Sequence, residues 1–167
     1  MNQTDFFEAL DRLSSGERAV LRRASGQLIQ EADAQSMAVF YRCLPWNAHE
    51  NYFDEERWFA SACFHCLWEA ESGPRQPLEQ VMKEMRKKSD SMEHRLTSLL
   101  DMSWETDGYL LTKLSRIVKM ARQQGYCVDC DSLLEDLLHW NSDTQYVQRK
   151  WARAMYYDKE KEDINAV

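Results

Sequence analysis

The segment between Gly108 and Gly125 constrains the fold most strongly, because it combines a helical apolar repeat with charge of a single sign. Its apolar residues recur every three or four positions, and at 100° per residue they fall within an arc of about 120°. They are Leu110, Leu111, Leu114, Ile117, Val118 and Ala121. The pattern predicts an amphipathic α-helix with one face packed on a core and the other exposed to solvent.

The rest of the chain also carries the residue patterns that mark the starts and ends of helices. Only five glycines and three prolines occur in 167 residues, and no long stretch alternates apolar and polar residues as a strand would. Capping residues, first-turn acids and helix-breaking residues predict boundaries near Thr4-Asp5, Ser14, Gly26, Pro45, Asp54, Ala70, Pro77, Ser89-Asp90, Thr106-Asp107, Asp131 and Asp143-Thr144. We therefore predict a single all-α domain over residues 1–167, with eight or nine helices in two small bundle-like lobes. The predicted lobe boundary lies at 72–77.

Charge is sorted along the chain. The formal net charge is −7, yet the 109–124 segment carries Lys113, Arg116, Lys119 and Arg122 and no acid. The helical rise from Lys113 to Arg122 is about 13.5 Å, or about four phosphate steps along one DNA strand. This one-sided charge is typical of a surface that binds a polyanion.

Three other basic clusters accompany this segment: Arg18, Arg22 and Arg23; Lys83, Arg86, Lys87 and Lys88; and Arg149, Lys150 and Arg153. By contrast, the stretch 31–71 holds eight acids and two arginines. A single basic helix face is more often merely solvated. The four clusters together predict a nucleic-acid groove, and acids beyond a Debye length of about 8 Å are largely screened from it.

Composition also suggests a location and argues against several other classes of protein. The first twenty residues are charged throughout, so no secretory signal is expected. The longest uncharged apolar stretch, 58–68, is too short for a membrane helix, so no membrane partner is expected. Five cysteines favour a reducing compartment over a disulfide framework. We expect a cytoplasmic protein.

No catalytic constellation or cofactor motif is present, and we do not expect an enzyme. The four histidines share no spacing with a nucleophile, and no glycine-rich loop could hold a phosphate. An alternative remains in two Cys-x-x-Cys pairs, Cys63/Cys66 and Cys127/Cys130, whose spacing suits zinc. The first pair falls mid-helix among apolar residues, which favours a role in the core over a metal site.

Several segments, in this order along the chain, resemble one known family. They are Leu21-Arg22-Arg23-Ala24, Glu93-His94-Arg95-Leu96 with Leu99-Leu100, Leu114-Ser115-Arg116-Ile117-Val118, and the ending from Leu133-Leu134 through Trp140 to Val147-Gln148-Arg149-Lys150-Trp151. Together they are similar to the small subunit of type I-E CRISPR surveillance complexes, the CasB family.

This resemblance implies a non-catalytic subunit of the RNA-guided Cascade complex, present there as a pair. Its expected partners are crRNA, target DNA with its displaced strand, and the other Cascade subunits. Carried over by motif, Arg23, Arg95 and Arg116 are expected to contact nucleic acid. The charge pattern adds Arg22, Lys113, Lys119, Arg122, Arg149, Lys150 and Arg153.

A third hypothesis is a protein–protein adaptor that contacts no nucleic acid. The acidic stretch from Glu50 to Glu56, next to Tyr52 and Phe53, could dock a basic neighbouring subunit.

Overall fold

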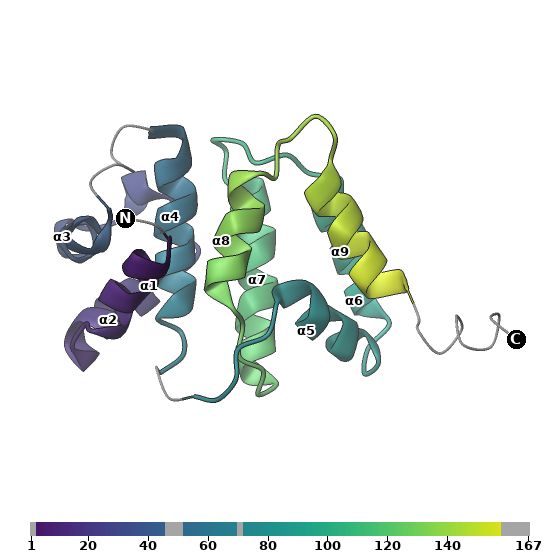
Figure 1. The fold of residues 1–167 in the computed structure, drawn as a ribbon, viewed down its shortest axis with the longest axis horizontal. Helices are drawn as coiled ribbons and strands as arrows, with labels where there is room; N and C mark the ends of the chain where they lie inside the picture. The colour runs from purple at the N-terminus through teal and green to yellow at the C-terminus, as the bar shows by residue number, and fades with distance from the viewer. Residues whose placement is uncertain (1–2, 46–51, 70–71, 158–167) are drawn as a thin grey trace, which may run out of the picture.

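The protein is all-α, as predicted, in a computed structural model that describes residues 3–45, 52–69 and 72–157 (Figure 1). In this described part, nine α-helices and one short 3₁₀ helix form: α1 Gln3–Asp11, α2 Ser15–Arg23, η1 Ile29–Glu31, α3 Ala34–Cys43, α4 Tyr52–His65, α5 Leu78–Arg86, α6 Ser91–Leu100, α7 Tyr109–Gln123, α8 Cys130–Leu138 and α9 Tyr146–Tyr156. Among these described helices, none is long and apolar enough to cross a membrane.

The helices form two groups that share one core. In Figure 1, α1 to α4 gather on one side and α5, α6 and α9 on the other, with α7 and α8 between them. α4 packs along α8, and α5 packs along α9. A single cluster of buried residues runs through both groups, from Phe6 and Phe40 to Trp140 and Trp151. The two groups are therefore joined by apolar packing as well as by the chain.

The connecting segment between the two groups is held in place by backbone hydrogen bonds. The Gln76 N–H donates to the Cys127 carbonyl at 2.8 Å, and the Asp129 N–H donates to the Gln76 carbonyl at 2.7 Å. The Trp68 indole, just past α4, donates to the Tyr126 carbonyl at 2.8 Å. These contacts tie the end of α4 and the connection to α5 to the short segment between α7 and α8.

Arg18 of α2 is a buried cation that contacts the end of α1 and the segment just past α4. Its guanidinium donates to the carbonyl of Leu10 at 3.1 Å and to that of Trp68, and Asp11 lies 3.8 Å away. α2 itself begins with a complete capping box, in which Ser14 and Glu17 exchange side-chain-to-backbone hydrogen bonds. Of the predicted basic cluster Arg18, Arg22 and Arg23, Arg18 is therefore part of the protein interior and not of its surface.

α7 lies at the centre of the fold, packed against α4, α5 and α6. Two glycines allow the neighbouring chain to approach it closely. Gly26 has φ +90, and a Cβ there would stand 2.6 Å from the Ser115 hydroxyl. Gly108, with φ +77, caps the start of α7 beneath the side chain of Leu28. The turn after α2 therefore packs closely against α7, through Gly26 at Ser115 and Leu28 at Gly108.

Some helix boundaries differ from the predicted ones. α4 ends at His65 rather than near Ala70, because the chain turns there to place the Trp68 indole on Tyr126. α7 and α9 begin at Tyr109 and Tyr146, two or three residues after the predicted capping residues. At both starts the preceding residue has a left-handed backbone.

His65 is a buried titratable group between α4 and α1. Its Nε2 lies 2.7 Å from Asp11 Oδ1, and its ring meets Phe7 edge-on. Burial, with the nearby charge of Arg75, lowers the pKa of His65 to about 4, although the contact with Asp11 acts in the opposite direction. The imidazole is therefore neutral in the folded protein near pH 7, with Nε2 donating to Asp11.

We expect this histidine to make the fold acid-sensitive. Below about pH 6.5 an unfolded chain protonates His65 while the folded chain does not, so stability is lost as the pH falls from 6.5 towards 4. Urea unfolding at a series of pH values should show the wild type losing about 3 kcal/mol relative to His65→Gln between pH 7 and pH 4. Parallel pH curves for the two proteins would contradict this account.

Candidate nucleic-acid interface

The apolar face of α7 is buried and its cations are exposed, as the sequence predicts. All six apolar residues of the helix repeat lie in the core. Lys113, Arg116, Lys119 and Arg122 are exposed. Among the described residues, these four cations take part in no ion pair, and the helix carries no acid. The α7 basic face, defined as Lys113, Arg116 and Lys119, spans about 9 Å along the helix axis.

The α7 basic face adjoins the end of α2. Lys119 Nζ donates to the Ser25 carbonyl at 3.1 Å, which holds the ammonium in place and leaves two of its three donors for another partner. Arg23, two residues before Ser25, is exposed. The end of α2, which carries Arg23, therefore adjoins Lys119 on α7, although the two helices are far apart in sequence.

Lys150 and Arg22 serve the protein's own structure. Lys150 forms an ion pair with the buried carboxylate of Asp136 on α8, which also accepts a hydrogen bond from the Trp151 indole at 2.8 Å. Arg22 donates to the Cys66 carbonyl at 2.9 Å and pairs with Glu69 at 3.0 Å. Periodicity could not have revealed either contact, because both join helices that are distant in sequence.

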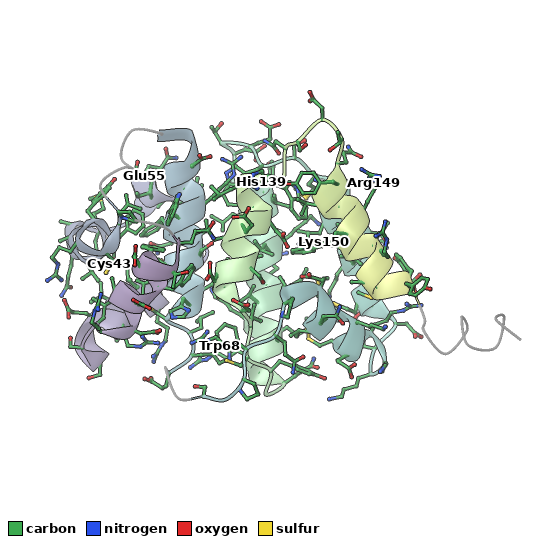
Figure 2. All side chains as sticks on the ribbon, in the orientation of Figure 1. Cys43, Glu55, Trp68, His139, Arg149 and Lys150 are labelled. Atoms are coloured by element: carbon green, nitrogen blue, oxygen red, sulfur yellow. The ribbon has the colours of Figure 1, made fainter. Side chains whose placement is uncertain are left out.

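The other predicted cations are exposed on separate helices. Arg95 lies on α6, which packs on α5 and α7. Arg149 and Arg153 lie on α9, which packs on α5. Figure 2 places Arg149 on the outer side of α9 and Lys150 on the side that faces α8. These three arginines do not belong to the α7 basic face.

The cluster at the end of α5 is largely used inside the fold. Lys83 and Arg86 donate to the carbonyls of Tyr157 and Met155, which closes the end of α9 against α5. Arg86 also stands over the Tyr156 ring at 5.2 Å. These cations therefore act mainly as cross-links between helices.

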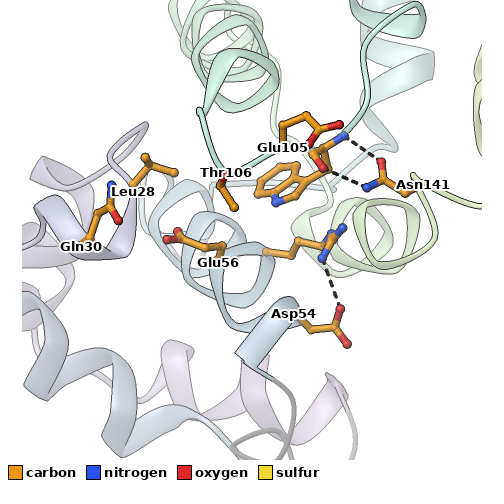
Figure 3. A pocket seen from close by; sticks show the side chains of 9 residues that line it. Leu28, Gln30, Asp54, Glu56, Glu105, Thr106 and Asn141 are labelled. Atoms are coloured by element: carbon orange, nitrogen blue, oxygen red, sulfur yellow. Dashed lines mark hydrogen bonds and ion pairs between the residues drawn. The ribbon is translucent and has the colours of Figure 1, made fainter.

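A pocket of about 600 Å³ opens between η1, the start of α4 and the loop before α7 (Figure 3). Its lining holds the carboxylates of Asp54, Glu56 and Glu105 and a single cation, Arg57. Arg57 stands 5.3 Å over the ring of Trp104. Three acids against one base would repel phosphate, so the pocket does not extend the basic surface.

The cysteine pairs are part of the core. All five cysteines are buried and free. Burial raises the pKa of the Cys66 thiol to about 12 and also raises that of Cys130, so both side chains are protonated thiols in the core. Within the described residues, no group of three or more His, Cys, Asp or Glu side chains is arranged to hold a metal. Of the acidic stretch 50–56 predicted for an adaptor, residues 50 and 51 lie outside the described residues.

Residues 17–157 match the family model of the CRISPR-associated protein Cse2. The chain belongs to the Cse2 family. A relative within this family, the CRISPR-associated protein Cse2 of Thermus thermophilus, is 27% identical over an alignment 163 positions long. The alignment covers 86% of this chain and 91% of that protein. The resemblance inferred from the sequence motifs is confirmed.

Solved structures share the fold over nearly the whole chain. The CasB crystal structure from M. ruber aligns with a TM-score of 0.74 at 25% identity, covering 99% of this chain and 98% of that one. A Cse2-family protein from Thermus thermophilus aligns with a TM-score of 0.76 at 24% identity, covering 93% and 98%. A chain of a CRISPR RNA-guided surveillance complex aligns with a TM-score of 0.74 at 20% identity, covering 99% and 97%.

The surface around α7 includes one residue that the charge pattern did not single out. Tyr109, the first residue of α7, is 66% exposed. Its place four residues before Lys113 and seven before Arg116 was visible in the sequence. Its exposure was not, because a tyrosine at the start of an amphipathic helix could equally pack into the core.

We expect Asp136 to be the main polar support of α9. Asp136→Ala leaves the Trp151 N–H and the Lys150 ammonium without their buried partner, and should lower the free energy of unfolding by about 3 kcal/mol. Asp136→Asn keeps an acceptor for the indole and should cost less. Chemical denaturation followed by tryptophan fluorescence measures both variants, and an alanine variant as stable as the wild type would contradict this role.

Proposed function

We propose that this Cse2-family protein is a non-catalytic subunit of an RNA-guided antiviral surveillance complex of the Cascade type. In this proposal its basic surface binds the phosphates of crRNA and target DNA, including the displaced strand, and stabilises the R-loop. The observation that carries the proposal is the α7 basic face, a row of exposed cations on an acid-free helix within an acidic chain. The other proposed partners are the remaining Cascade subunits and a second copy of this chain.

The proposed mechanism is electrostatic bracing. In an RNA-guided complex, sequence is read by base pairing, and strand exchange is close to balanced in free energy. A few phosphate contacts, each of which releases a condensed counterion, are then enough to favour the open form. The protein needs no reactive group for this task, only cations held at fixed positions.

The cations proposed to bind nucleic acid are exposed and form no ion pair within the described residues. Lys113, Arg116 and Lys119 form the centre of this surface, and Arg23 is exposed at the adjoining end of α2. Arg122 extends it at the end of α7, while Arg95, Arg149 and Arg153 are proposed as separate contacts. Arg22 and Lys150 are left out, because each already pairs with a carboxylate of the same chain.

The test is the target-DNA affinity of the reconstituted complex. Lys113→Gln combined with Arg116→Gln should weaken binding by tenfold or more, or about 1.4 kcal/mol. The slope of log affinity against log salt should become shallower by about 1.4, because two phosphate contacts are lost. The variant should still join the complex, since neither side chain contributes to the core.

A matched control removes two positive charges elsewhere. Arg12→Gln combined with Arg42→Gln changes the net charge equally, at exposed positions on the α1–α4 group. Affinity should then stay within about twofold of the wild type. If the α7 variant binds target DNA as the wild type does while fully incorporated, the nucleic-acid role of α7 is wrong and the adaptor hypothesis replaces it.

A further inference from the structure

Tyr109 differs from the exposed tyrosines Tyr41, Tyr146 and Tyr156 in having no ring partner within the described residues. It is 66% exposed, the largest fraction among the exposed large apolar residues of the described chain. The Tyr156 ring lies under Arg86, and the Tyr146 ring lies 6.0 Å from that of His139. Within the described residues, no aromatic or cationic side chain covers the ring of Tyr109. The face of this ring is therefore available to stack on an aromatic partner.

The position of Tyr109 is fixed by the start of α7. Its backbone N–H donates to the carboxylate of Asp107 at 3.0 Å. Gly108, immediately before it, lies in a left-handed conformation against Leu28. The ring is therefore presented from a rigid helix end, which lowers the entropic cost of binding through it.

Tyr109 shares a helix face with two cations. At 100° per residue, Tyr109, Lys113 and Arg116 lie within an arc of about 60°. The rise along the helix is about 6 Å from the tyrosine to the lysine and about 10.5 Å to the arginine. These distances correspond to roughly two and three phosphate steps at about 3.4 Å each.

An aromatic side chain in line with cations is the arrangement that binds single-stranded nucleic acid, with bases on the ring and phosphates on the cations. Resting on the proposed function, we propose that Tyr109 stacks on an unpaired base of the displaced DNA strand while Lys113 and Arg116 hold the phosphates that follow. The carboxylate of Asp107, at the other end, disfavours phosphates there and so favours their placement on the Lys113 side of the ring.

α9 repeats the tyrosine–lysine–arginine spacing of α7, but its side chains are not free to bind nucleic acid in the same way. Tyr146, Lys150 and Arg153 are placed as Tyr109, Lys113 and Arg116 are, at the start of a helix that also follows a left-handed residue. There, however, the lysine is bound to Asp136 and the tyrosine ring lies beside His139. The proposal therefore assigns base stacking to α7 alone.

The experiment compares Tyr109→Ala, Tyr109→Leu and Tyr109→Phe in the reconstituted complex, with Tyr41→Ala as a surface-tyrosine control. Alanine and leucine should weaken target-DNA binding at least about fivefold, and phenylalanine should restore it. The salt slope should stay unchanged in all of them, because no phosphate contact is lost. A displaced strand carrying 2-aminopurine should show one position that is quenched with tyrosine or phenylalanine and bright with leucine.

Each other outcome overturns a stated part of the account. Wild-type affinity in Tyr109→Ala, with binding still weakened by Lys113→Gln and Arg116→Gln, removes the stacking and leaves the proposed function. If Tyr109→Ala and the combined Lys113→Gln and Arg116→Gln variant both bind target DNA as the wild type does, the proposed function is wrong as well. A phenylalanine variant as weak as alanine assigns the effect to the hydroxyl. A leucine variant that binds normally, or an alanine variant that fails to join the complex, assigns the ring to an apolar protein contact.

Discussion

The burial of one face of α7 is the interaction on which the rest of the structure depends. Its apolar residues pack against α4, α5 and α6, so this helix links the two helix groups through their shared core. Because α7 is amphipathic, the packing of its apolar face also fixes where its cations point. The stability of the core and the position of the basic face are coupled through geometry, since any core substitution that rotates α7 would also move the basic face.

The cations of this chain fall into two classes. Arg18, Arg22, Arg86 and Lys150 are held by carbonyls, carboxylates or aromatic rings of the protein itself. Their removal would leave polar groups of the fold unpartnered, with a cost in stability. The exposed cations of α7 form no ion pair in the described chain. Lys119 donates a hydrogen bond to the Ser25 carbonyl, whereas Lys113, Arg116 and Arg122 add little to the stability of the fold. Because these exposed cations form no ion pair within the described chain, we assign them to the proposed nucleic-acid partner.

The sequence predicts the all-α class and the orientation of α7 because both depend on local periodicity, which survives without knowledge of the rest of the fold. The capping box at Ser14 is predictable for the same reason. The contacts of Lys150 with Asp136 and of Arg22 with Glu69 are not, because they depend on how distant helices cross. The turn at His65 and the solvent exposure of Tyr109 likewise follow from tertiary packing.

The central claim is that the outward face of α7 lies on nucleic acid in the assembled complex. The most direct measurement is a cryo-electron microscopy structure of the reconstituted complex with target DNA bound. We predict phosphate oxygens within hydrogen-bonding distance of the side chains of Lys113 and Arg116. A map in which this face is covered by another protein subunit, or is open to solvent along the whole path of the DNA, would contradict the account.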